Sequence, residues 1–161
     1  METKSTKGSF YDNLLEEASS LIERQDPVIS VLANVSSLLW ERLPNVNWLG
    51  FYLLSGKTLF VGPFQGKPAC VQIDLGRGVC GKAASLKKPI VVDDVDRFPG
   101  YIACNKETRS ELVIPILYNG VLKGVLDIDS PLEERFEDED VKGLTAIVNL
   151  VATNWDGKGL L

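Results

Sequence analysis

The sequence predicts an α+β fold in which a central, mainly antiparallel six-stranded sheet carries the N-terminal and C-terminal helices on one face. Two observations lead to this prediction. Helical periodicity occurs at the two ends of the chain, and short apolar segments separated by turn residues fill the middle. The strand–helix alternation of a doubly wound parallel sheet is missing. A chain of 161 residues is expected to form one domain, 1–161, with residues 1–9 as a flexible N-terminal end.

Three segments have the spacing of amphipathic helices. Residues 10–22 and 27–43 place apolar side chains three and four positions apart, so each buries one face. Residues 141–155 repeat the pattern, and acidic residues precede them where the positive end of the helix dipole favours negative charge.

The predicted strands are short and are separated by turn signals. They occupy residues 46–54, 58–64, 70–75, 90–92, 111–117 and 121–129. Asn119-Gly120 is the sequence of a type I′ hairpin turn, and residues 82–86 predict a short helix. Residues 93–110 show no clear period, and a long irregular loop in a compact domain is often functional.

Charge and hydropathy exclude several classes of protein. The net charge of −5 argues against a nucleic-acid partner, which would need a basic surface facing the phosphates. The longest apolar runs cover only a few residues, so no membrane span is expected, and residues 1–7 lack the apolar core of a secretory signal. We therefore expect a cytoplasmic protein whose thiols are kept reduced.

The chain contains no histidine, which excludes a Ser-His-Asp triad, a Cys-His pair and an HExxH zinc site within it. Proton transfer would fall to carboxyl groups, Tyr, Lys or Cys. The three cysteines include no CxxC pair, so we expect neither a metal nor another cofactor.

The segment Gly76-Arg-Gly78-Val-Cys-Gly81 matches the letters of a dinucleotide-binding motif. In that motif the following helix must be long enough to return to a parallel strand. Only about eight residues separate Gly81 from Pro89, which is too few for such a helix. We interpret these glycines as residues that permit positive φ and close packing of a loop.

Two interpretations are open for the three cysteines, Cys70, Cys80 and Cys104. A free cysteine is often a small buried hydrophobic residue, and this reading is strongest for Cys70 within a predicted strand, weaker for Cys80 and weakest for Cys104. A cysteine held in an irregular loop near other cysteines is suited to nucleophilic attack followed by disulfide closure. The residues alone leave both readings open.

A series of motifs then supports a resemblance. In order along the chain they are Asn47-Trp-Leu-Gly-Phe-Tyr52, Gly62-Pro-Phe-Gln-Gly-Lys-Pro-Ala-Cys70, Gly76-Arg-Gly-Val-Cys-Gly81, Phe98-Pro-Gly-Tyr-Ile-Ala-Cys104, Ser110-Glu-Leu-Val-Ile-Pro115 and Gly124-Val-Leu-Asp-Ile-Asp-Ser-Pro131. Together they resemble the free methionine-(R)-sulfoxide reductases, a family built on a single GAF domain. The resemblance runs from about residue 10 to 155. Tyr101 and Asn105 stand where that family commonly has His and Asp.

The resemblance implies an enzyme that reduces free methionine-(R)-sulfoxide and is recycled by a thioredoxin-type reductant. It implies Cys104 as the nucleophile, and it leaves Cys70 and Cys80 as alternative resolving cysteines. It further implies that Trp48 and Tyr52 line the substrate pocket and that Asp93 supports it. The sequence leaves the oligomeric state open, a homodimer included.

The resemblance also implies that Glu111, Asp127 and Asp129 bind the ammonium group and the sulfoxide oxygen and donate the proton. Chemistry agrees, because Asp127 and Asp129 are two positions apart on a predicted strand and share one face. Two carboxylates so placed need a cation or a shared proton between them. The alternative is a solvent-facing pair, with Leu126 and Ile128 on the buried side.

Two alternatives to the enzyme use the same fold. A non-catalytic GAF sensor would bind a small ligand such as a cyclic nucleotide, although a pocket rich in acidic residues disfavours phosphate anions. A redox sensor would use the disulfide as a signal without turning over a substrate.

Overall fold

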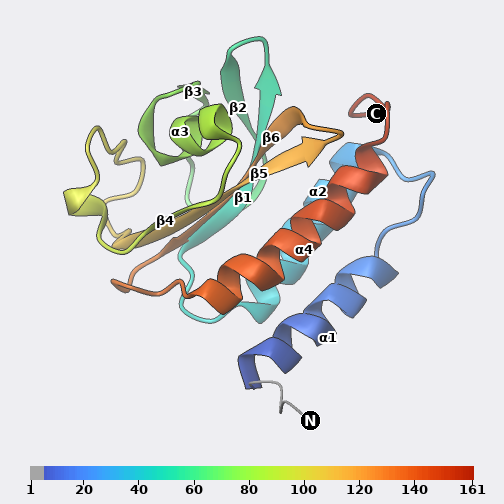
Figure 1. The fold of residues 1–161 in the computed structure, drawn as a ribbon, viewed down its shortest axis with the longest axis horizontal. Coiled ribbons are helices and arrows are strands. Elements are labelled where there is room, and N and C mark those ends of the chain that lie inside the picture. The colour runs from blue at the N-terminus through green and yellow to red at the C-terminus, as the bar shows by residue number, and fades with distance from the viewer. Residues whose placement is uncertain (1–5) are drawn as a thin grey trace.

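The computed structural model describes residues 6–161 and confirms the α+β architecture (Figure 1). Its helices are α1 (Thr6–Ser20), α2 (Val28–Arg42), α3 (Gly78–Leu86) and α4 (Asp138–Trp155). Its strands are β1 (Trp48–Ser55), β2 (Thr58–Gly66), β3 (Gln72–Asp74), β4 (Ile90–Val92), β5 (Ser110–Tyr118) and β6 (Val121–Ser130), with a 3-10 turn at Val95–Arg97.

The strands form one six-stranded sheet in the order β3-β2-β1-β6-β5-β4, and all neighbours are antiparallel. β1 pairs with β6 at the centre, so the two hairpins β1–β2 and β5–β6 are joined side by side. The β5–β6 turn places Asn119 and Gly120 at φ of 49° and 76°, which confirms the predicted type I′ geometry.

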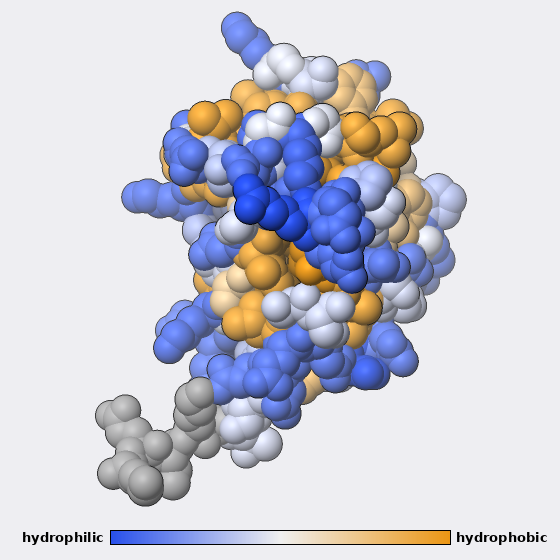
Figure 2. Space-filling model, turned by 90° about the vertical axis from the view of Figure 1, so that its right-hand side faces the viewer, coloured by the Kyte–Doolittle hydropathy of each residue, from blue (hydrophilic) through white to orange (hydrophobic). Residues whose placement is uncertain are grey.

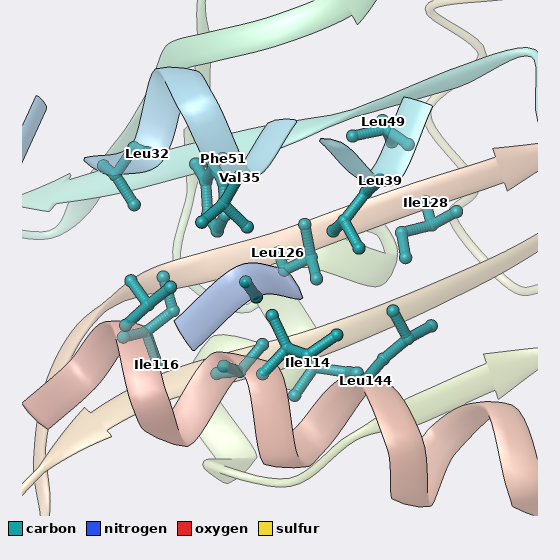
Figure 3. Close-up of a cluster of buried hydrophobic side chains, with 14 of the residues drawn as sticks. Leu32, Val35, Leu39, Leu49, Phe51, Ile114, Ile116, Leu126, Ile128 and Leu144 are labelled. Atoms are coloured by element: carbon teal, nitrogen blue, oxygen red, sulfur yellow. The ribbon is translucent and has the colours of Figure 1, made fainter. Parts of the chain in front are cut away.

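The larger hydrophobic core lies between the sheet and the helices α2 and α4, with α1 packed outside against α4 (Figures 1 and 3). Alternate residues of the central strands point into it, and Figure 3 shows Phe51, Ile114, Leu126 and Ile128 facing Leu39 and Leu144 from the helices. Each fully buried side chain of this size contributes about 1.5–3 kcal/mol. The other residues of these strands therefore face the opposite side of the sheet.

That opposite side carries α3 and a second, smaller core that includes Trp48, Tyr52, Val113 and Val125 (Figure 1). The prediction that the terminal helices share one face is confirmed, and the short helix α3 covers the other. Polar side chains on this second face are therefore enclosed between the sheet and α3.

Several boundaries differ from the predictions. Residues 1–5 of the predicted flexible end lie outside the described residues, but Thr6 already begins α1, so the prediction is wrong for residues 6–9. α3 begins at Gly78 rather than at residue 82, and β3 is limited to Gln72–Asp74. Cys70 therefore precedes the strand instead of lying within it.

The early start of α1 has a physical reason in a buried polar cluster around Asp140. This carboxylate accepts hydrogen bonds from Tyr11 Oη at 2.6 Å, Lys7 Nζ at 2.7 Å and Arg135 at 3.2 Å. It also accepts one from the backbone N–H of Glu137 at 2.8 Å, as part of a capping box. Such contacts attach α1 to the first turn of α4.

Burial and hydrogen bonding have opposite effects on the pKa of Asp140. Burial raises the pKa, but the hydrogen bonds from Glu137 N–H, Lys7 and Tyr11 outweigh burial and hold the pKa below its ordinary value. A carboxylate with a depressed pKa stabilises the fold above its unfolded pKa of about 3.9, and that contribution is lost as the pH falls through the folded-state value.

None of the helices in residues 6–161 has the length and apolar character needed to cross a membrane. Seen from the right-hand side of Figure 1, the surface is largely hydrophilic, with hydrophobic groups between polar side chains (Figure 2).

We predict that Asp140→Asn lowers the free energy of unfolding by about 2–3 kcal/mol, because it leaves Lys7 and Arg135 without their buried partner. Urea unfolding near pH 7 measures the change, and the difference from wild type should shrink on acidification. The exposed Asp138, in the same turn of α4, provides the control, and Asp138→Asn should change stability by less than about 0.5 kcal/mol. Equal losses for both variants would contradict the assigned role of Asp140.

Candidate active site

A pocket lies between the second face of the sheet and α3, closed at its mouth by the loops before β3 and β5. It brings together most of the residues singled out in the sequence. Its lining comprises Trp48, Tyr52, Pro68, Ala69, Ile73, Gly78, Val79, Cys80, Tyr101, Ile102, Cys104, Asn105, Glu111, Asp127 and Asp129.

The floor of the pocket is a carboxyl cluster on the neighbouring strands β5 and β6. Glu111 lies directly opposite Asp129 in the strand register, and Asp127 is the next residue along on the same face. Asp127 is only 6% exposed, and Asp129 is half-buried with one carboxylate oxygen fully enclosed, so the alternative of a solvent-facing pair is wrong. Within residues 6–161, one carboxylate oxygen each of Asp127 and Asp129 is buried without a hydrogen-bond partner.

Burial controls how these carboxyl groups titrate. It raises the pKa of Glu111 and Asp129 well above their usual range, and repulsion from neighbouring carboxylates adds to the increase. Burial also raises the pKa of Asp127, although hydrogen bonds from Glu111, Cys80 and Asp129 oppose the increase. The cluster therefore binds protons more tightly than ordinary carboxyl groups do, and it is arranged either to give one up or to accept a cation.

The cysteine pair lies at the mouth of the pocket. A disulfide joins Cys70 and Cys104, whose Cα atoms are 5.7 Å apart and which are 34 positions apart in sequence. The reading of Cys70 as a buried hydrophobic residue within a strand is therefore wrong. The resemblance left Cys70 and Cys80 open as partners of Cys104, and the fold pairs Cys104 with Cys70.

Cys80 is a free and buried thiol in the first turns of α3. Burial raises its pKa well above the ordinary value, and the charges of Asp127 and Glu111 add to the increase. Its sulfur and carboxylate oxygens of Glu111 and Asp127 all lie within 4.8 Å of one another. These three donor atoms are one fewer than the four protein ligands of a structural zinc site, and they include no imidazole.

An aromatic wall stands beside the carboxyl cluster. Trp48 and Tyr52 share one face of β1, as their four-residue spacing predicted, and both line the pocket with ring centroids 6.0 Å apart. Trp48 also stacks on Phe64 of β2 at 5.3 Å. These rings offer an apolar, polarisable surface that suits a methylthio group.

The same two aromatic residues anchor the loop that carries Cys70. Trp48 Nε1 donates to the carbonyl of Lys67 at 3.0 Å, and Tyr52 Oη donates to the carbonyl of Cys70 at 2.9 Å. An ion pair of 3.2 Å between Lys67 and Glu107 links this loop to the segment that follows Cys104. The loops bearing the two cysteines are thus held together over the pocket.

The glycine motif shapes the turn between β3 and α3. Gly78 has a φ of +60°, and a Cβ there would lie 3.0 Å from the side chain of Ile102 in the Cys104 loop. A Cβ on Gly81 would come within 2.4 Å of the carbonyl oxygen of Asp74. The strand after α3, β4, pairs antiparallel with β5 at the sheet edge, so the parallel crossover of a dinucleotide site is absent from this part of the described chain.

Asp93 is a predicted site residue that lines a different cavity. It is exposed and lines a separate surface cavity with Asp94, Arg97 and Glu133. Its backbone carbonyl accepts a hydrogen bond from the N–H of Glu134. It directly follows Val92, the register partner of Glu111, but it is exposed and lines this other cavity, so its support of the pocket stays a prediction.

Sequence reasoning did not single out the apolar lining formed by Ile73, Val79 and Ile102. The alternation of residues 70–75 indicates that Ile73 points inward, but no sequence signal places Ile102 over Gly78. That contact depends on the path of the irregular loop.

Comparisons with known proteins agree with this geometry. Residues 9–155 match the model of the GAF domain. The free methionine-R-sulfoxide reductase of Escherichia coli is 46% identical over 142 residues, which cover 88% of this chain and 86% of that protein.

Two solved structures extend the comparison. The Staphylococcus aureus free methionine-R-sulfoxide reductase in complex with substrate superposes with a TM-score of 0.85 at 46% identity, covering 89% of this chain and 94% of that one. The Neisseria meningitidis enzyme in complex with its substrate gives a TM-score of 0.88 at 35% identity, covering 96% and 93%.

Fold and site together define the class: a GAF domain whose pocket holds a disulfide-forming cysteine pair beside buried carboxyl groups. The chain belongs to the GAF family and, within it, to the free methionine-R-sulfoxide reductases.

We predict that the oxidised protein shows no reactive thiol in its native state near pH 8. Burial and a raised pKa keep Cys80 protonated and inaccessible, and the other two cysteines are joined. Titration with a thiol reagent before and after unfolding in guanidinium measures this, and unfolding should expose one thiol per chain. A fast reaction of the folded protein would contradict the assignment.

Proposed function

We propose that this protein reduces free methionine-(R)-sulfoxide to methionine, with Cys104 as nucleophile and Cys70 as resolving cysteine. The observation that carries the proposal is the position of the Cys70–Cys104 disulfide at the mouth of a pocket whose floor is the carboxyl cluster of Glu111, Asp127 and Asp129. Nucleophile, second thiol and proton donor are the three components that thiol-based sulfoxide reduction needs.

The pocket supports a free amino acid as substrate. An ammonium group is a cation that can approach the unpartnered oxygens of Asp127 and Asp129 and offset the mutual repulsion of the cluster. The methylthio end then lies against Trp48 and Tyr52. A methionine sulfoxide residue within a protein lacks the free ammonium group, so the same contacts disfavour it.

The chemical step transfers the sulfoxide oxygen to Cys104. The Cys104 thiolate attacks the sulfoxide sulfur, and a protonated carboxyl group of the cluster supplies the proton that the departing oxygen needs. The sulfur–oxygen bond then breaks, and the hydroxyl is transferred to the Cys104 sulfur. The transient bond between the two sulfurs breaks with its electron pair returning to the methionine sulfur, so methionine is reduced by two electrons and Cys104 is oxidised to the sulfenic acid. Glu111 is suited to the proton transfer because burial raises its pKa and so favours the protonated carboxyl group.

The second step forms the disulfide. The thiol of Cys70 attacks the Cys104 sulfenic acid, a sulfur–sulfur bond forms, and the hydroxyl leaves as water. Cys70 is better placed than Cys80, because it lies at the pocket mouth beside Cys104 whereas Cys80 is enclosed against the carboxyl cluster. A thioredoxin-type dithiol then returns both cysteines to thiols, a cycle that we place in the cytoplasm.

The structure gives less support to the two alternatives. A cyclic-nucleotide sensor would have to place a phosphate near three carboxyl groups, and no Lys or Arg lines the pocket among residues 6–161. A redox sensor without a substrate would not require a buried proton donor beneath the cysteine pair.

We predict that Cys104→Ser abolishes the reduction of free methionine-(R)-sulfoxide. Cys70→Ser should release about one methionine per enzyme and then stop. Without Cys70, the sulfenic acid of Cys104 cannot be converted into the disulfide that thioredoxin reduces. Cys80→Ser should retain steady turnover, because that thiol takes no part in the electron transfer. Methionine release measured with and without a thioredoxin regenerating system separates these outcomes, and turnover by Cys104→Ser would refute the proposal.

We predict that Glu111→Gln lowers kcat by about 10²-fold or more, the usual contribution of a positioned proton donor. The wild-type rate should also fall as the pH rises through the elevated pKa values of the cluster, since only the protonated carboxyl group can donate. A pH–rate profile of a single turnover measures both effects.

Glu16 provides the matched control, since it is exposed on α1 and Glu16→Gln should leave the rate unchanged. A Glu111→Gln enzyme with the wild-type pH–rate profile would contradict the assigned proton donor.

A further inference from the structure

The pocket has three carboxyl groups but few hydrogen-bond donors whose hydrogen is still available. Trp48 Nε1 already donates to the carbonyl of Lys67, and Tyr52 Oη donates to the carbonyl of Cys70. The Cys80 thiol is a weak donor enclosed against Glu111 and Asp127. A substrate that carries a sulfoxide oxygen and a carboxylate needs donors that these three side chains do not offer.

Two other polar side chains line the pocket, those of Asn105 and Tyr101. The Asn105 side-chain oxygen accepts from the N–H of Glu107 at 3.0 Å, which fixes the side chain in its own turn and leaves only its amide N–H groups as donors. The Tyr101 hydroxyl makes no hydrogen bond within residues 6–161. Tyr101 is half-buried, and its ring packs against the second core, so the ring is held while the hydroxyl stays free.

Tyr101 also lies close to the reacting atoms. It precedes Cys104 by three positions in the same loop, and both residues line the pocket. Burial raises the pKa of its phenol above the ordinary value, and the nearby carboxylates of Glu111, Asp129 and Asp127 add to the increase. The hydroxyl therefore keeps its hydrogen at every pH at which the enzyme would work.

We propose that Tyr101 is a further catalytic residue, whose hydroxyl donates a hydrogen bond to the sulfoxide oxygen. This inference rests on the proposed function. As Cys104 attacks, negative charge grows on that oxygen, so the hydrogen bond strengthens toward the transition state. Tyr101 holds the oxygen, while the proton that completes its departure comes from the carboxyl cluster.

Tyr101→Phe tests the proposal because it removes the hydroxyl and keeps the ring. We expect kcat/KM for free methionine-(R)-sulfoxide to fall about tenfold or more, mainly through kcat. The control is Tyr118→Phe. Tyr118 is the last residue of β5, at the end of the strand away from Glu111, and its hydroxyl donates to Asp156, so this change should leave kcat/KM as in wild type. Thermal unfolding confirms that both variants fold.

Ligand binding identifies the atom that Tyr101 contacts. In a Cys104→Ser background, calorimetry should show that Tyr101→Phe weakens binding of methionine-(R)-sulfoxide severalfold and leaves binding of methionine, which lacks the oxygen, unchanged. Equal losses for both ligands, or unchanged kinetics and sulfoxide binding, would overturn the proposal. A wild-type enzyme without activity on free methionine-(R)-sulfoxide would instead refute the proposed function, so the two failures are distinguishable.

Discussion

Burial of three carboxyl groups on one face of the sheet is the constraint on which the site depends. The register that pairs Glu111 with Asp129 brings the groups together, and α3 covers that face of the sheet. An ionised carboxylate in such surroundings costs several kcal/mol unless a partner offsets it. Since no cationic side chain lines the pocket among residues 6–161, protons or a cationic ligand must supply that partner.

The strands of the sheet carry the carboxyl groups, and the loops carry the two cysteines that form the disulfide. The carboxyl groups lie on the neighbouring strands β5 and β6, whose opposite face is packed by the helices of the main core, so their spacing is fixed by that core. The cysteines lie on loops, and a loop can adjust its path when a disulfide forms or breaks. Trp48 and Tyr52 connect the two parts through hydrogen bonds to the Cys70 loop.

Local patterns predicted much of this arrangement. Periodicity identified the helices. A spacing of two residues placed Asp127 and Asp129 on one face of their strand, and a spacing of four did the same for Trp48 and Tyr52. The pairing of Cys70 with Cys104 could not be read from spacing, because it depends on how two loops meet over the pocket. The start of α1 and the place of Asp93 also depend on tertiary contacts, with Asp140 in the first case and with the β4 edge in the second.

The central claim is that the empty pocket holds protons that the ammonium group of the substrate displaces. Proton release on binding tests it directly, by calorimetry of methionine-(R)-sulfoxide with reduced Cys104→Ser in buffers of different ionisation enthalpy near pH 7. The account predicts a net release of up to about one proton per ligand bound, because the cation lowers the raised pKa values of the cluster. Binding without any exchange of protons would contradict it.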